Sequence, residues 1–178
     1  ITVYWEDQRG VQPKSFGPHA LLLACLEDDS GCDRVQLGEL VQAIPKKGDS
    51  KLLTALAHDA KRVRDAGPIV VVFDNDRVRR LLELDHGACK RVVIETVTNA
   101  CPVDLSVVLL EDNVEDLLNA CLRAVGAPEL QSKPNPNDRD TICQRVARAT
   151  REARDKVRRE APSFDRLVRY VKDCLPTN

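Results

Sequence analysis

The 178-residue chain has few aromatic side chains, no methionine and no long apolar run. Aromatic residues make up 3% of the chain, so its core must be built from Val, Leu, Ile and Ala. The longest apolar stretch, around Ala20–Leu26, is far too short to cross a bilayer, and we expect no membrane association. No signal peptide is visible, and because the chain starts at Ile1 we expect it to be trimmed or cut from a longer protein.

An excess of one charge sign is also missing. The chain carries 27 Lys and Arg against 28 Asp and Glu, so any nucleic-acid surface would have to be local. The seven cysteines form no Cys-x-x-Cys pair, which argues against a zinc site. Scattered cysteines of this kind are typical of reduced, mostly buried thiols, and they predict a cytoplasmic protein.

The most informative segment is the apolar run 69–73, which ends in Asp74-Asn75-Asp76. Five apolar residues without polar alternation are typical of a strand buried on both faces of a parallel sheet. Carboxylates at the carboxyl end of such a strand open into the crevice where α/β sheets bind ligands. Two neighbouring acids repel each other unless a cation lies between them, which favours a divalent metal. An ordinary polar turn is the alternative interpretation.

The rest of the chain alternates between strand-like and helix-like patterns. We expect strands at 1–5, 69–73, 91–97 and 105–110, and helices at 18–27, 49–66, 77–84 and 113–125. This alternation predicts an α/β fold with a largely parallel sheet flanked by helices. We divide the chain into an α/β domain (1–127), a proline-rich linker (128–137) and a two-helix C-terminal extension (138–178).

Acidic residues follow three of the expected strands. Glu6-Asp7 follows the first strand, Asp74 and Asp76 follow a central one, and Glu111-Asp112 precedes Glu115 in the next helix turn. Because the carboxyl ends of parallel strands share one sheet edge, we expect these clusters to converge. A first-turn acid such as Glu115 also complements the helix dipole, and this simpler explanation stays open. Taken together, the clusters favour a metal site.

These positions resemble the Toprim domain, which topoisomerases, bacterial primases and the overcoming-lysogenization-defect nucleases share. The resemblance rests on Glu6 after the first strand, the Lys-Gly-containing loop 47–51 before a helix, the Asp-x-Asp of Asp74 and Asp76, and Glu115. It is strongest to the overcoming-lysogenization-defect nucleases and spans roughly residues 1–125. The glycine that usually follows the first glutamate of the family is replaced by Asp7 here.

The resemblance implies metal-dependent hydrolysis of phosphodiester bonds in DNA or RNA. Glu6, Asp74, Asp76 and Glu115 would hold one or two Mg²⁺ or Mn²⁺ ions, and Lys51 (or Lys47) would balance charge on the phosphate. A topoisomerase would need a nucleophilic tyrosine, and the chain has only Tyr4 and Tyr170, so hydrolysis is favoured over strand transfer. Relatives of this type also suggest a protein partner such as an ATPase.

The segment 138–160 is the basic part of the expected C-terminal extension. Its cations are Arg139, Arg145, Arg148, Arg151, Arg154, Lys156, Arg158 and Arg159. They would form the nucleic-acid surface of a nuclease if the segment is one helix that tracks a phosphate backbone. The alternative is a solvated helix held by ion pairs with Glu152, Asp155 and Glu160.

Two other functions stay open beside the nuclease. A receiver-like signalling domain would also place an acidic pair after the first strand and an aspartate, here Asp74, after the third. It would want a lysine after the last strand, where this chain has Glu111. A Toprim-like module without catalytic activity, serving as an interaction partner, is compatible with every feature above. His19 lies just after the first acidic cluster, close enough in sequence to reach the same edge.

Overall fold

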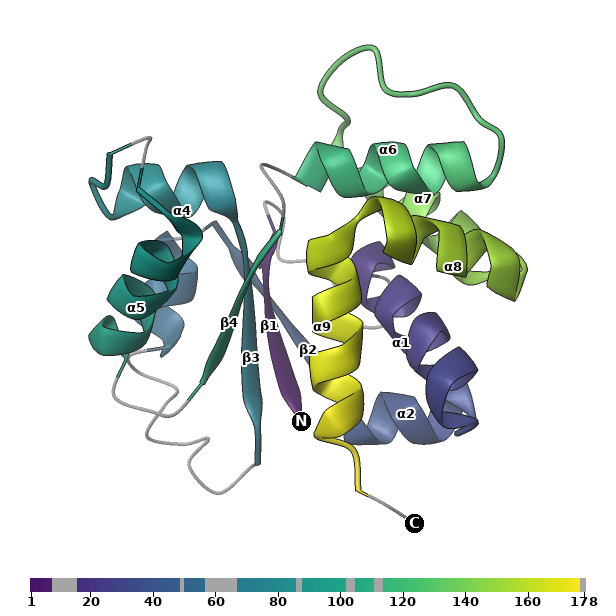
Figure 1. The fold of residues 1–178 in the computed structure, drawn as a ribbon, viewed down its shortest axis with the longest axis horizontal. Coiled ribbons are helices and arrows are strands. Elements are labelled where there is room, and N and C mark those ends of the chain that lie inside the picture. Colours follow the sequence, from purple (N-terminus) through teal and green to yellow (C-terminus); the bar gives the residue numbers. More distant parts are fainter. Residues whose placement is uncertain are drawn as a thin grey trace.

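Four parallel strands form one sheet in the computed structural model, which describes residues 1–7, 16–48, 50–56, 67–85, 88–101, 105–110 and 114–176. The side chains of residues 7 and 47 lie outside this description. The strands are β1 (Thr2–Asp7), β2 (Gln42–Lys47), β3 (Ile69–Asp74) and β4 (Ser106–Leu110), and their order across the sheet is β2-β1-β3-β4 (Figure 1). The expected α/β fold with a parallel sheet flanked by helices is confirmed.

Helices cover both faces of the sheet (Figure 1). One face of the sheet carries α4 (Asn75–Leu81), α5 (Lys90–Ala100) and a helical stretch at 50–56. The other face carries α1 (Gly17–Ser30), α6 (Val114–Ala124), α7 (Pro136–Ala147), α8 (Arg151–Glu160) and α9 (Pro162–Asp173). Helix α2 (Arg34–Leu40) lies beside α1. Within the described ranges, no helix combines the length and the apolar character that crossing a membrane requires.

Strand β3 supplies side chains to a separate core on each face. Val70 and Val72 belong to the core shared with α1 and the C-terminal helices, whereas Val71 and Phe73 belong to the core beneath α5. Successive side chains of a strand point to opposite faces, so a central strand covered on both sides must be apolar at every position. All six residues of β3 are buried, which confirms the strand expected from the run 69–73.

The strand expected at 91–97 is wrong, because these residues lie within helix α5. Val93 and Val97, four residues apart, are buried against the core, while Val92 is exposed. That spacing is one face of an amphipathic helix, and the β-branched residues that suggested a strand serve as its apolar stripe. The helical spacing of the buried residues was therefore visible in the sequence, but the β-branched residue types led to the prediction of a strand.

The C-terminal segment forms three helices where two were expected. The helix expected over 138–160 is interrupted: α7 ends at Ala147 and α8 begins at Arg151, where Thr150 caps the new helix by accepting a hydrogen bond from the Ala153 N–H. Residues of α7, α8 and α9 share one core with β1, β3 and α1. These helices thus complete the α/β core on that face of the sheet.

Candidate functional site

Glu6 and Asp74 meet at the carboxyl ends of the two central strands. Glu6 follows Trp5 in β1, whose register partner Val72 lies two residues before Asp74 in β3. Both acids are almost fully buried, with exposed fractions of 6% and 5% for the whole residues. The strand order reverses between β1 and β3, and this switch point is where open α/β sheets bind ligands.

A guanidinium group lies between the two carboxylates. Arg77, in the first turn of α4, donates from Nη1 to Glu6 Oε1 at 2.9 Å, and its Nε is 3.9 Å from Asp74 Oδ2. The arginine side chain is 23% exposed, whereas those of the two acids are 3% and 6% exposed. Buried carboxylates require a compensating charge, and Arg77 supplies it from within the chain.

Asp76 does not share in this cluster. Its side chain is half exposed and accepts a hydrogen bond from Arg80 Nη2 at 3.1 Å, one turn further along α4. An acid in the first turn of a helix, paired with an arginine four residues later, is ordinary helix chemistry. The second aspartate of the Asp-x-Asp therefore faces α4's own arginine.

The remaining candidates from the sequence are not joined to the acids by any described contact. Glu115 lies half-buried in the first turn of α6, and Lys51 is exposed in the helical stretch 50–56. Residues 111–113 and the side chains of Asp7 and Lys47 lie outside the described part. Among the residues that the structure does describe, no group of three or more His, Cys, Asp or Glu side chains is placed to hold a metal ion.

These residues fit a divalent cation only in part. The carboxylate oxygens of Glu6 and Asp74 are the hard ligands that Mg²⁺ and Mn²⁺ prefer. However, Arg77 occupies the position between them, and one site cannot hold a guanidinium and a metal ion together. The described side chains therefore form an arginine-bridged acid pair rather than a metal centre.

A small pocket adjoins the acid pair, and a second arginine lines it. Arg139 of α7 is 7% exposed and borders this pocket together with Trp5, Glu6 and Asp74. Arg139 was predicted from the sequence to lie on a nucleic-acid surface, and Arg77 was not predicted as a site residue. The signal for Arg77 was its spacing: three residues after Asp74, at a strand-to-helix junction, it lies on the same helix side as the acid.

His19 packs beside this pocket without touching the acids. Its ring lies edge-on to Trp5, with 6.4 Å between ring centroids, and its Nε2 is 3.2 Å from the Val41 carbonyl oxygen. Burial lowers the pKa of His19 to about 4, despite the opposing hydrogen bond to Val41. The imidazole is therefore neutral near pH 7, and Nε2 donates its proton to the carbonyl. Within the described structure, His19 Nδ1 and Trp5 Nε1 are buried without a hydrogen-bond partner.

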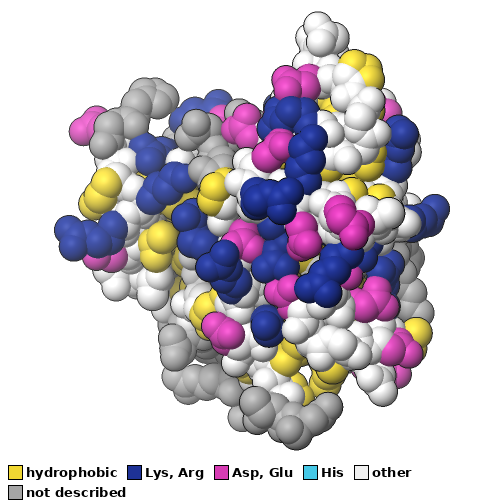
Figure 2. Space-filling model, turned by 45° about the vertical axis from the view of Figure 1, so that its right-hand side comes forward, with side chains coloured by type: hydrophobic (Ala, Val, Ile, Leu, Met, Phe, Trp, Pro, Cys, Tyr) yellow, Lys and Arg dark blue, Asp and Glu magenta, His cyan; other side chains and the backbone are white. Residues whose placement is uncertain are grey.

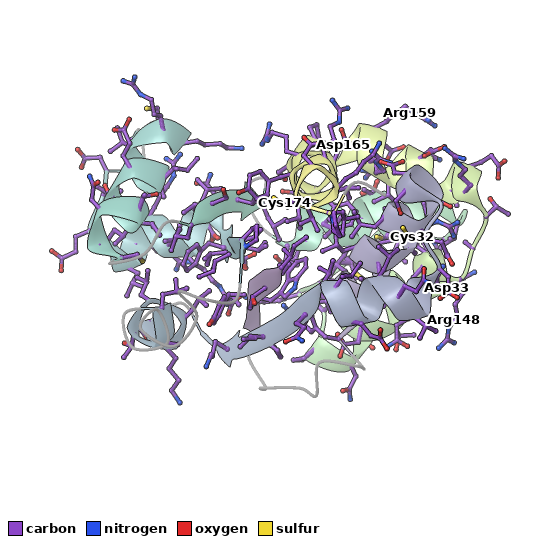
Figure 3. The ribbon with its side chains drawn as sticks, turned by 90° about the horizontal axis from the view of Figure 1, so that it is seen from below. Cys32, Asp33, Arg148, Arg159, Asp165 and Cys174 are labelled. Carbon is purple, nitrogen blue, oxygen red and sulfur yellow. The ribbon has the colours of Figure 1, made fainter. Side chains whose placement is uncertain are left out.

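The basic C-terminal segment is largely occupied by ion pairs. Arg154 forms a two-pronged contact with Asp28 of α1, at 2.5 and 2.7 Å, and Arg158 bridges Asp29 (2.8 Å) and Asp165 (2.7 Å). Figure 2 shows basic and acidic side chains interleaved over the face that carries the C-terminal helices. Figure 3 shows Asp165 on α9 beside α8, whereas Arg159 points outward.

Comparisons with family models, curated proteins and solved structures find no match for this chain. The resemblance to the Toprim domain therefore stays a prediction based on the residues themselves.

Proposed function

We propose that this chain is a doubly wound α/β interaction module in which Arg77 takes the place of a divalent cation. The observation that carries the proposal is the 2.9 Å contact between Arg77 Nη1 and Glu6 Oε1, with Asp74 on the other side of the guanidinium. In this proposal Glu6 and Asp74 bind Arg77 at the switch point, and their carboxylates are therefore not open to a ligand. Such a module acts by binding other molecules through its surfaces and has no catalytic metal.

Energetics supports this assignment. A metal ion that bound Glu6 and Asp74 would first have to displace Arg77, a step that breaks a mostly buried ion pair. The ion would therefore compete with the guanidinium for the same carboxylate oxygens, and its apparent affinity would be lowered by the free energy of the ion pair that it replaces.

Thermal unfolding in chelator, in Mg²⁺ and in Mn²⁺ tests the proposal. We expect the same melting temperature in all three solutions, and no cleavage of single- or double-stranded DNA or RNA. A metal-binding protein would gain about 2.7 kcal/mol at a metal concentration a hundred times its dissociation constant. A gain of that size that disappears in Asp74→Asn would contradict the proposal.

Metal-dependent hydrolysis of DNA or RNA is the second candidate. It is favoured by the meeting of Glu6 and Asp74 at the switch point, where Mg²⁺ or Mn²⁺ would polarise a phosphate if Arg77 moved aside. In this candidate Asp76 and Glu115 would have to turn toward the acid pair, and Lys51 would have to reach the phosphate. Cleavage that requires Mn²⁺ and is lost in Asp74→Ala would establish it. Labelling of Asp74 by acetyl phosphate would instead identify a receiver-like domain.

A further inference from the structure

The edge strand β4 lies at the bottom of a groove between two helices. The groove is lined by Leu105 and residues 106–109 of β4, by Ile94 and Thr98 of α5, and by Arg166 and Tyr170 of α9. Figure 1 shows β4 at the edge of the sheet, with α5 on one side and α9 on the other. Within the described structure, β4 pairs only with β3. One row of its backbone N–H and C=O groups therefore faces the groove.

The two edges of the sheet are protected very differently. Edge strand β2 carries Pro45, which has no backbone N–H, and Lys46, which adds a charge. Both kinds of residue discourage another strand from pairing. Edge strand β4 reads Ser-Val-Val-Leu-Leu and has neither proline nor charge. Val107 and Val108 remain half-buried at this edge. An apolar, uncharged edge is a template for an added strand.

The rim of the groove is positively charged. Among the described residues that line it, Lys90, Arg166 and Arg169 are basic and Asp173 is acidic. Arg169 also pairs with Asp165, whose side chain is only 14% exposed, so Arg166 is the rim cation on which the charge argument rests. Tyr170 is 36% exposed and offers an aromatic surface within the groove. The groove thus combines free backbone groups, apolar walls and a basic rim.

We propose that this groove binds an extended acidic segment of a partner protein, which adds to the sheet as a fifth strand beside β4. The backbone groups of β4 would supply the hydrogen bonds, and alternate side chains of the segment would contact Ile94 and Tyr170. Acidic residues of the segment would face Arg166. The inference rests on the proposed role as an interaction module, but it uses a different surface from the acid pair.

Selection from a random peptide library displayed on phage tests this proposal. We expect the wild type to enrich acidic peptides with alternating apolar residues. Their affinity should fall at least about tenfold in Arg166→Glu, and should be unchanged in the matched control Arg159→Glu, where the arginine is exposed on α8. Methylating alternate backbone nitrogens along one edge of a selected peptide should abolish binding, and methylating those along the other edge should not, because an added strand uses one edge only.

Three results would overturn the inference: no enriched peptide, equal losses in Arg166→Glu and Arg159→Glu, or equal tolerance of methylation on both peptide edges. The inference and the proposed function fail by different measurements. Metal binding at Glu6 and Asp74 would remove the proposed function and leave the peptide result standing. Absence of peptide binding would remove only the groove's role.

Discussion

The acids at the strand ends and the arginines of the C-terminal helices both form ion pairs, yet their surroundings differ. Arg154 and Asp28 lie between packed helices, with side chains 9% and 10% exposed. Arg77 and Glu6 lie at the switch point of the sheet, beside a pocket lined by Trp5. The first pair closes a helix interface, whereas the second fills a crevice where doubly wound folds bind ligands.

This difference shows that the number of charges in a segment does not reveal its role. The basic segment contains enough arginine for a nucleic-acid surface, but Arg154 and Arg158 are committed to acids on α1 and α9. The strand-end acids have the placement of a metal site, but an arginine from the next helix compensates them. In both regions the ion-pair partner of a charged side chain, and not its residue type, determines the role of that side chain.

The largest expected effect concerns the closed interface. Arg154→Ala should lower the free energy of unfolding by about 4 kcal/mol, because it leaves the Asp28 carboxylate buried without its partner. The matched control Arg151→Ala removes an exposed pair with Asp155 and should change the stability by less than ~0.5 kcal/mol. Denaturant unfolding of both variants measures the contrast. Equal losses would show that Arg154 has no special structural role.

Gly17→Ala tests how tightly α7 docks on α1. A Cβ at Gly17 would lie 2.5 Å from the Asp140 carbonyl oxygen, so one helix would have to shift. We expect a loss of about 2 to 3 kcal/mol in the free energy of unfolding. The control Gly38→Ala lies in α2 with open space around the new methyl group, and it should gain about 0.5 kcal/mol. If both changes stabilise the protein in denaturant unfolding, the close approach of the two helices is not as described.

Acidification should destabilise the core beside the acid pair through His19. The folded-state pKa of His19 is about 4, below its ordinary value of 6.5, so the unfolded chain binds the proton more readily. Stability from this group is therefore full above pH 6.5 and is lost as the pH falls toward 4. Between pH 7 and pH 5 the loss should be about 2 kcal/mol. His19→Gln should show a correspondingly smaller pH dependence in denaturant unfolding, and an unchanged slope would assign the effect to other groups.

The smallest expected effect concerns the exposed arginines. Arg148 and Arg151 are solvent-exposed, and reversing both to glutamate tests the nucleic-acid surface expected from the sequence. Since the proposed function is binding to proteins rather than to nucleic acids, we expect affinity for DNA or RNA to stay weak and its salt dependence not to change. Fluorescence anisotropy over a salt series measures this. A flatter slope of log affinity against log salt in the double variant would instead show that these arginines contact phosphates.

The sheet and its central acids could be predicted because their signals are local. An apolar run that ends in Asp74 identifies both the strand and the edge where its acid lies. Strand β2 was harder to find, because Pro45 and Lys46 look like a turn and only the neighbouring β1 makes them a strand. The pairing of Arg77 with Glu6 joins residues 71 positions apart, and no pattern in the sequence specifies which carboxylate an arginine will reach.

Titration of Mn²⁺ into the wild type and into Arg77→Gln, followed by thermal unfolding and calorimetry, tests the role of Arg77 most directly. The wild type should neither bind the ion nor change its melting temperature. Arg77→Gln should be less stable by about 3 kcal/mol in chelator, because Glu6 and Asp74 lose their counter-charge, and Mn²⁺ should restore part of that stability. The double variant Arg77→Gln with Asp74→Asn should lose the rescue. If Mn²⁺ stabilises the wild type as much as Arg77→Gln, the arginine does not take the place of a metal ion.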